Sequence, residues 1–171
     1  TCKNYTHQTK YRLSVAPSPN LPDMKSVYLY SSMCYFEGTV VSLGRGTDLP
    51  FQVYGHPAMK GCAFSFTPRS KIGAKNPPLL NQKCYGVDLS HKSDSEICKK
   101  GLDLSYVIDA YHRLGIGDRF FTPFFEKLIG VGYVRKMIES GKTAGEIRAC
   151  WKNDVEKFKK QRAKYLLYDD K

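Results

Sequence analysis

The amino-acid sequence predicts an α+β fold, in which a strand- and loop-rich first half is followed by three to four helices. Short runs of β-branched and aromatic residues, bounded by glycine and proline, occupy the first half. In the second half, apolar residues recur at helical spacing. Strands and helices do not alternate, which argues against βαβ units and a parallel sheet. Because 42% of the 171 residues are hydrophobic, we expect residues 1–171 to form a single domain with its own core.

Six short runs in the first half have the composition of strands. They are rich in Val, Tyr, Phe and Leu, and glycine, proline or polar residues separate them. The runs cover residues 11–15, 27–30, 39–43, 51–54, 63–67 and 84–89. Residues 68–78, which precede the last run, are rich in lysine, glycine and proline and predict a loop.

Four helices are predicted in the second half. The first has an apolar stripe that Gly115 closes, with members Leu104, Val107, Ile108, Tyr111 and Leu114. The second begins near Thr122 and Pro123, because threonine is a common N-cap and proline is favoured at the first helical position. A short third helix covers residues 133–139 and stops before Gly141.

The fourth and longest helix lies near the C-terminal end of the sequence. Thr143 and Glu146 match a capping box, which marks its start. We expect its apolar face to be buried, with Trp151 in the core rather than stacked on a ligand. The residues on this face are Ile147, Cys150, Trp151, Val155, Phe158 and Tyr165.

The formal net charge of +11 suits an anionic partner, such as nucleic acid, a membrane surface or an acidic glycan. The lysines of the last third, however, are interleaved with Asp154 and Glu156, which is typical of a solvated helix face. We therefore expect no nucleic-acid partner. No apolar run approaches the roughly 18–20 residues of a membrane-spanning helix, so no membrane span is expected either.

Neither a metal nor a cofactor is expected. The six cysteines are widely spaced and the four histidines are scattered, with no Cys-x-x-Cys pair and no cluster at zinc-ligand spacing. The sequence also has no glycine-rich dinucleotide fingerprint and no P-loop. The cysteines fit either buried or partly buried free thiols, or disulfides, on which a chain of this size does not depend.

Residues 34–51 combine apolar and charged groups in one glycine-containing run. Glu37 is the acid of its apolar first part. Arg45 stands between two glycines and precedes Thr47 and Asp48. A partly buried carboxylate can act as a proton donor in glycoside hydrolysis, for which Asp48 is a weaker second acid. Alternatively, Glu37 and Arg45 form an ion pair that orients a polar ligand or only fixes a loop.

Two further side chains are candidates for ligand binding. Asn20 lies among prolines that restrict its loop, so its amide has a fixed direction. This amide either holds a sugar hydroxyl or satisfies its own turn. His56 lies in a Gly-His-Pro turn without a visible acid partner, and it is either a site residue or a surface histidine.

Four segments carry a family resemblance. They read Pro-Ser-Pro-Asn-Leu-Pro at 17–22, Phe-Glu-Gly-Thr at 36–39, Gly-Arg-Gly-Thr at 44–47 and Tyr-Leu-Leu-Tyr at 165–168. In this order they resemble the exo-acting β-N-acetylmuramidases of bacterial cell-wall recycling. The similarity runs from about residue 11 to residue 168, which is nearly the whole chain.

The resemblance implies that the chain is the C-terminal half of a larger two-domain glycoside hydrolase. Members of that family have an N-terminal Rossmann-like domain, which is absent from this sequence, and a smaller C-terminal domain that packs on it. They release terminal N-acetylmuramic acid from peptidoglycan fragments in a cleft between the domains. The principal catalytic glutamate is then expected in the other domain. The expected location is extracytoplasmic, periplasmic or secreted, rather than cytoplasmic.

By the same resemblance, Glu37 has a supporting catalytic role. The substrate-binding residues are expected to be Asn20, Arg45, Thr47, Asp48 and His56. The lactyl carboxylate of muramic acid gives Arg45 an anionic partner. The expected partners are a peptidoglycan-derived glycan or muropeptide and the Rossmann-like domain. The alternative is a non-catalytic module that binds anionic cell-wall glycans through Arg45 and the surface lysines.

Overall fold

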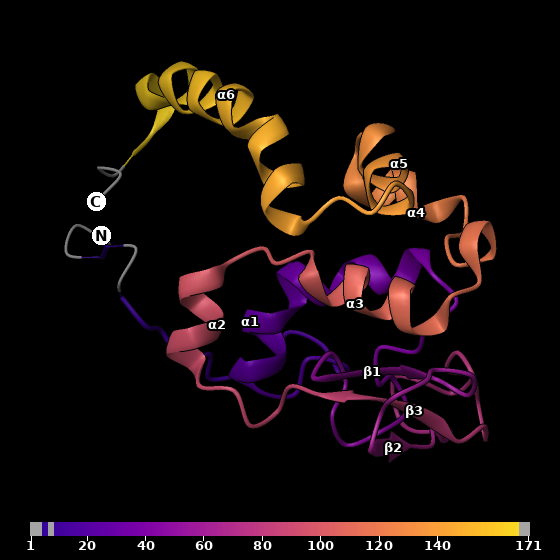
Figure 1. Ribbon diagram of the computed structural model, residues 1–171. Helices are drawn as coiled ribbons and strands as arrows, with labels where there is room; N and C mark the ends of the chain where they lie inside the picture. Colours follow the sequence, from indigo (N-terminus) through magenta and orange to yellow (C-terminus); the bar gives the residue numbers. More distant parts are fainter. Residues whose placement is uncertain (1–4, 7–8, 168–171) are drawn as a thin grey trace.

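The computed structural model describes residues 5–6 and 9–167 of the chain (Figure 1). A three-stranded antiparallel sheet lies beside α1 and α3, and α4, α5 and α6 lie on the far side of α3 (Figure 1). The α+β class is therefore confirmed. The predicted order of strands before helices is wrong, because helix α1 precedes the sheet.

The sheet has the order β1-β3-β2, with strands β1 (Val53–His56), β2 (Phe64–Phe66) and β3 (Cys84–Asp88). The central strand β3 pairs antiparallel with both neighbours, and Gly86 lies opposite Gly55 of β1 and Phe64 of β2. The predicted strands at 63–67 and 84–89 are confirmed, and the one at 51–54 overlaps β1. The predicted loop at 68–78 is also confirmed.

Three of the predicted strands are wrong. Residues 27–30 lie inside helix α1 (Met24–Met33), whose N-cap Asp23 accepts a hydrogen bond from the Ser26 backbone nitrogen at 2.8 Å. A short apolar run does not distinguish strand from helix, and the cap together with burial of the helix decides here. Residues 39–43 form only isolated bridges, and residues 11–15 form no strand.

The second half of the chain contains more helices than the three to four predicted. Its helical segments are α2 (Asp94–Lys100), α3 (Ser105–Leu114), η2 (Gly117–Arg119), α4 (Phe124–Ile129), α5 (Tyr133–Glu139), α6 (Ala144–Arg162) and η3 (Ala163–Tyr165). The four predicted helices correspond to α3, α4, α5 and α6. Helix α2 was missed because it is only seven residues long and buries a single apolar side chain, Ile97, which leaves no periodic pattern.

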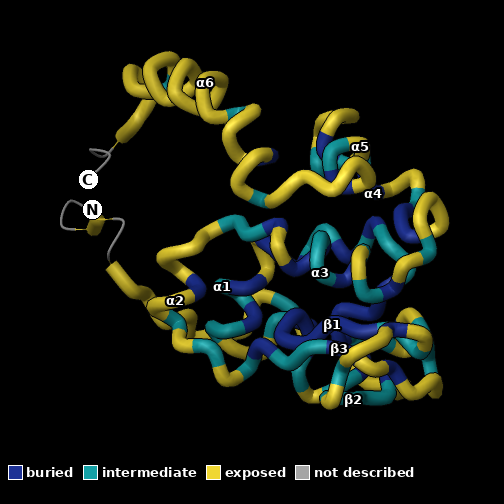
Figure 2. Tube along the Cα trace, in the orientation of Figure 1, coloured by how far each residue is buried: buried dark blue, intermediate teal, exposed yellow. Residues whose placement is uncertain are grey.

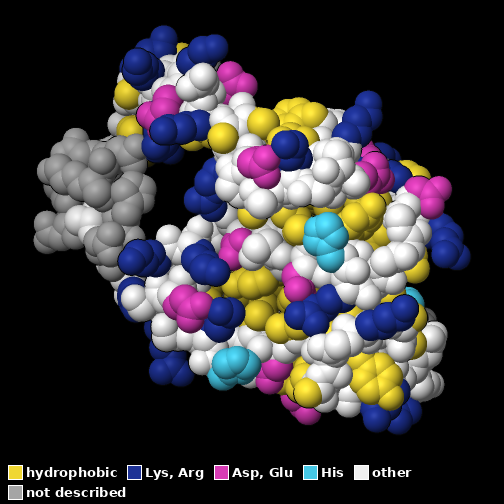
Figure 3. All heavy atoms as spheres, viewed as in Figure 1, with side chains coloured by type: hydrophobic (Ala, Val, Ile, Leu, Met, Phe, Trp, Pro, Cys, Tyr) yellow, Lys and Arg dark blue, Asp and Glu magenta, His cyan; other side chains and the backbone are white. Residues whose placement is uncertain are grey.

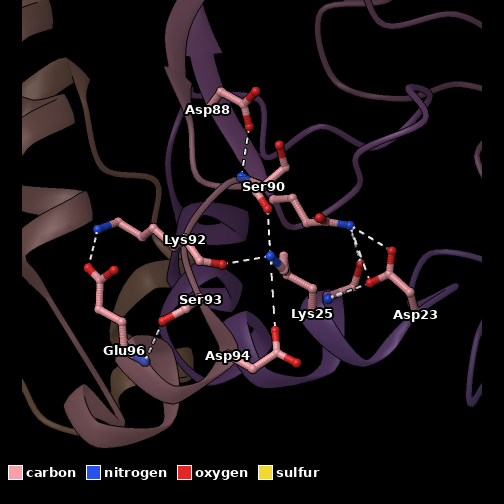
Figure 4. Close-up of polar contacts among 10 residues, drawn as sticks. Asp23, Lys25, Asp88, Ser90, Lys92, Ser93, Asp94 and Glu96 are labelled. Atoms are coloured by element: carbon pink, nitrogen blue, oxygen red, sulfur yellow. Dashed lines mark hydrogen bonds and ion pairs between the residues drawn. The ribbon is translucent and has the colours of Figure 1, made fainter.

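A polar network fastens α2 to the start of α1 (Figure 4). Lys25 donates to the backbone oxygens of Ser90 and Lys92, each at 2.6 Å, and its ammonium lies 4.0 Å from the Asp94 carboxylate. The Asp23 carboxylate also accepts a hydrogen bond from the Gln52 side chain. Charge-assisted bonds of this kind are stronger than neutral ones, so the network fixes the first turn of α1 against the loop after β3.

The core lies between the sheet and helices α1, α3 and α4. Figure 2 shows buried residues concentrated in this region, whereas most of α6 is exposed. Part of the core is an aromatic cluster in which Phe121 lies 4.8 Å from Phe120 and 4.5 Å from Phe125, measured between ring centroids. None of the described helices is both long and apolar enough to cross a membrane.

The described cysteines are free thiols, namely Cys34, Cys62, Cys84, Cys98 and Cys150, and Cys2 lies outside the described residues. Burial raises the pKa of the Cys34 and Cys84 thiols to about 11. The prediction of buried or partly buried thiols holds for three of these residues, because Cys98 and Cys150 are exposed.

The apolar face predicted to be buried along α6 is buried only at its start. Ile147 is fully buried and Trp151 is half-buried, so the prediction of Trp151 in the core is only partly right. Val155 and Phe158 are 42% and 61% exposed, and Cys150 and Tyr165 are exposed as well. The reason is geometric, because α6 extends away from the rest of the domain after its first turns (Figures 1 and 2).

The capping box of α6 is confirmed and gives a pH prediction. The Thr143 backbone nitrogen donates to the Glu146 carboxylate at 2.8 Å, and Lys142 pairs with the same carboxylate at 2.9 Å. These contacts, the Thr143 backbone bond first, lower the pKa of Glu146 from 4.5 to about 2. A lowered acid pKa stabilises the folded state above pH 4.5, and this contribution is lost as the pH falls through about 2.

NMR titration of the Glu146 side chain should therefore give a midpoint near pH 2. Fraying of the first turn of α6 should follow the same titration. Glu146→Gln is the control, because glutamine keeps the cap but does not ionise. An ordinary midpoint near 4.5 would contradict the capping geometry.

Candidate functional site

Glu37 and Arg45 form an ion pair at the end of the α1 segment. Helix α1 runs directly into the 3-10 helix η1 (Cys34–Gly38), which carries Glu37. Arg45 Nη2 donates to Glu37 Oε1 at 2.6 Å, and the side chains of Arg45 and Glu37 are 32% and 28% exposed. The ion pair anticipated from the sequence is therefore present, and it is open to solvent on one side.

The ring of Phe51 supports Arg45. The guanidinium carbon lies 5.1 Å from the ring centroid, which is cation–π distance. Phe51 is fully buried and has a φ of 60°, in the left-handed region that bulky residues rarely adopt. Such strain persists only where the surrounding structure enforces it, and it is enriched at functional sites.

The turn that presents Arg45 depends on the two glycines beside it. Gly44 and Gly46 have φ values of 84° and 80°, which favour glycine. The Thr47 hydroxyl donates to the Gly44 backbone oxygen at 2.7 Å and accepts from the Leu49 backbone nitrogen at 3.0 Å. Because the Thr47 hydroxyl makes both of these bonds within the turn, its main role here is to shape the loop.

Glu37 is also held from the other side, by α4. A Cβ atom on Gly38 would lie 2.5 Å from the Cα atom of Phe125, so η1 and α4 touch backbone to backbone. The Gly38 backbone oxygen accepts a hydrogen bond from the Thr122 backbone nitrogen at 2.9 Å. Two segments that are far apart in the sequence thus fix the position of Glu37.

Asn20, Thr47 and Asp48 line one shallow pocket, which we call the Asn20 pocket. It has a volume of about 210 Å³, and Lys71 and Ile72 also line it. Asn20 is almost fully buried, and its side-chain nitrogen donates to the Gly73 backbone oxygen at 2.9 Å. Asp48 is 94% exposed and pairs with Lys71.

Glu37 and Asp48 are thus members of two separate ion pairs, with Arg45 and with Lys71. His56 lies at the end of β1, apart from the residues that line the Asn20 pocket. Its Nδ1 accepts a hydrogen bond from the Ala58 backbone nitrogen at 3.1 Å, and burial lowers its pKa. Of the six candidate residues, Glu37 and Arg45 therefore form one pair, Asn20, Thr47 and Asp48 line the Asn20 pocket, and His56 belongs to neither group.

Sequence reasoning missed Lys71 and Phe51 as parts of this region. Lys71 lies 23 positions from its partner Asp48, in a loop without periodicity, so no local pattern marks the pair. Phe51 was identified only as the end of the run 34–51 and the start of a predicted strand, without a contact to Arg45. Within the described residues, no group of three or more His, Cys, Asp or Glu side chains is arranged to hold a metal ion.

Comparisons with known proteins agree on one family. The family model described as "Exo-beta-N-acetylmuramidase NamZ, C-terminal" matches residues 28–168. The peptidoglycan β-N-acetylmuramidase NamZ of Bacillus subtilis (strain 168) is 33% identical over 169 residues, which cover 90% of this chain and 40% of that protein.

A solved structure shares the fold. The crystal structure of a DUF1343 family protein from Bacteroides fragilis NCTC 9343 matches with a TM-score of 0.96 and 69% identity. The match covers 99% of this chain and 48% of that one. The chain thus spans less than half the length of both relatives.

Proposed function

The chain belongs to the NamZ exo-β-N-acetylmuramidase family, as its C-terminal domain, and we propose that it forms one wall of a substrate cleft in an enzyme that releases terminal N-acetylmuramic acid from peptidoglycan fragments. The observation that carries this proposal is the half-exposed ion pair of Glu37 and Arg45, within the segment that the family model matches. We propose an extracytoplasmic location on the same basis, since peptidoglycan lies outside the cytoplasmic membrane.

Arg45 is suited to bind an anionic substrate group. A guanidinium has five N–H donors, and in the described structure one nitrogen of Arg45 binds Glu37. The remaining donors have no hydrogen-bond partner among residues 5–6 and 9–167. An arginine with free donors in a fixed orientation can bind a carboxylate through two parallel hydrogen bonds. The lactyl carboxylate of muramic acid is a carboxylate of this kind.

Glu37 acts mainly by positioning Arg45. Its carboxylate already accepts a hydrogen bond from the Arg45 guanidinium at 2.6 Å, and η1, which carries Glu37, packs against α4. Glycoside hydrolysis needs carboxyl groups on both sides of the scissile bond. We propose that the principal acid comes from the N-terminal domain of the full-length protein, which would face this wall of the cleft.

The Asn20 pocket extends the wall. Its volume of about 210 Å³ is below the roughly 300–1,000 Å³ of pockets that enclose small molecules, so it suits a hydroxyl or acetamido group rather than a whole sugar. Asp48 and Lys71 place a negative and a positive group at its edge. We propose that these groups bind the polar substituents of the sugar.

Glu37→Gln in the full-length protein tests the proposal on a chromogenic glycoside of N-acetylmuramic acid. Glutamine keeps an oxygen that can accept from Arg45 but loses the charge, so we expect kcat/KM to fall about tenfold, because a hydrogen bond between charged groups is weakened. The matched control is Glu96→Gln, which removes an exposed carboxylate on α2 that is paired with Lys92. Unchanged activity in a folded Glu37→Gln protein would reject the role given to Glu37.

A second candidate function is a non-catalytic module that binds anionic cell-wall glycans. The cations of α6 favour it, and Lys152, Lys157, Lys159 and Lys160 lie on this helix. This candidate predicts muropeptide binding that weakens with salt and is not accompanied by turnover. Turnover of the muramic acid glycoside by the full-length protein would favour the glycosidase over the binding module.

A further inference from the structure

The apolar face of α6 is one continuous stripe that is covered only at its start. Ile147, Trp151, Val155 and Phe158 follow one another at intervals of four, four and three residues, which places them on the same side of the helix. Burial decreases along this series, from the fully buried Ile147 to Phe158, which is 61% exposed. We call Trp151, Val155 and Phe158 the distal face of α6.

The distal face borders a groove between α6 and the segment that joins α2 to α3. The groove has a volume of about 950 Å³, and Leu102, Trp151 and Val155 form part of its apolar lining. Arg148 anchors this end of α6 by donating to the backbone oxygens of Lys100 and Leu102. Figure 3 shows the hollow beneath α6 in the space-filling view.

The rim of the groove is basic. Its cationic residues are Lys100, Arg148, Lys152 and Lys159, and the acid that lines the groove with them, Glu156, is paired with Lys159 at 2.9 Å. A surface that is apolar at its centre and basic at its rim suits a partner with an apolar patch and an acidic rim.

We propose that the distal face of α6 and its basic rim dock on the N-terminal domain of the full-length protein. The 19-residue helix α6 buries one residue, Ile147, among the residues described. Helices in proteins are stabilised mainly by packing of their apolar face, so the rest of the stripe requires a partner. The chain matches 40% and 48% of its relatives' lengths, and the family model identifies it as the C-terminal part. The covering surface therefore lies in the other part of the same polypeptide.

This inference rests on the proposed two-domain architecture, but its test does not depend on catalysis. Hydroxyl-radical footprinting of the full-length protein, read by mass spectrometry, measures the oxidation rate of individual side chains. Phe158 is 61% exposed in this domain, and Phe124 of α4, a side chain of the same intrinsic reactivity, is 46% exposed. If α6 docks as proposed, Phe158 is oxidised more slowly than Phe124, which inverts the order of their exposures.

Faster oxidation of Phe158 than of Phe124 in the full-length protein would overturn the inference. Protection of Phe158 that disappears on dilution would overturn it too, because a second copy would then cover the face. Protection that persists on dilution supports the inference, and it does so even if the protein fails to turn over the muramic acid glycoside. In that case the proposed glycosidase function is rejected, and the proposed docking of α6 on the N-terminal domain is retained.

A pair of variants adds a second readout. Phe158→Asp places a charge on the distal face, and Asn153→Asp places the same residue on the opposite, exposed side of α6. In the full-length protein we expect Phe158→Asp to lower kcat/KM at least about fivefold, since buried aromatic anchors dominate interfaces, with Asn153→Asp unchanged. Equal activity of the two variants, with Phe158 oxidised rapidly in the parent, would contradict the proposal.

Discussion

Gly38→Ala should lower the free energy of unfolding by about 3 kcal/mol or more, the upper range for inserting a methyl group into a packed interior. The added Cβ atom would lie 2.5 Å from the Cα atom and 2.8 Å from the backbone nitrogen of Phe125. Backbone atoms of a helix cannot rotate away as a flexible side chain does. Helix α4 must therefore move away from η1, which also displaces Glu37.

Urea denaturation followed by circular dichroism measures this effect. Gly132→Ala is the matched control, because Gly132 has a φ of −82° and no heavy atom within 4 Å of an added Cβ. We expect the control to change the free energy of unfolding by less than about 0.5 kcal/mol. If the two variants are equally stable, the close contact between η1 and α4 is wrong.

Arg45→Ala should weaken the binding of N-acetylmuramic acid to the full-length enzyme by about 10- to 100-fold, the equivalent of a charged hydrogen bond of roughly 1.5–3 kcal/mol. The variant removes the guanidinium proposed to bind the lactyl carboxylate. N-acetylglucosamine lacks this carboxylate, so its affinity should change little. Inhibition constants of the two sugars, measured against hydrolysis of the chromogenic glycoside, give the comparison.

Arg45→Lys separates the charge of Arg45 from its shape. Lysine keeps a positive charge but cannot make two parallel hydrogen bonds to a carboxylate, so it should restore the affinity for N-acetylmuramic acid only in part. A structural role for Arg45 predicts a different result, in which Arg45→Ala weakens the binding of both sugars equally. Equal losses would therefore exclude Arg45 as the residue that selects the muramic acid carboxylate.

Local signals made part of the fold predictable. The strand at 84–88 has β-branched and aromatic residues, and the start of α6 has the capping box of Thr143 and Glu146. Each signal lies within a few residues, so a single sequence contains it. Helix α1 was missed because its local signal is the N-cap Asp23 alone. The helix also depends on the burial of Leu29 and Met33 against distant parts of the chain.

The face of α6 shows a second limit of prediction from sequence. An apolar stripe indicates which side of a helix is to be buried, but it does not indicate which molecule or domain buries it. At the site, Glu37 and Arg45 lie only eight positions apart, and the glycines beside Arg45 indicate a turn, so their contact could be predicted from the sequence. The pairing of Lys71 with Asp48 depends on how two loops meet, which local sequence does not encode.

The uninterrupted path from α1 into η1 makes the candidate site sensitive to its far end. The two helices follow each other from Met24 to Gly38 without a loop between them, and Lys25 is held near one end while Glu37 lies near the other. If the two helices moved as one rigid segment of about 20 Å, a tilt of roughly 5° would displace the far end by about 2 Å. Displacements of about 1 Å at a reacting centre can cost about a hundredfold in rate. Loss of the polar contacts of Lys25 is therefore expected to strain the contacts with α4 that hold Glu37, although Lys25 itself does not touch the site.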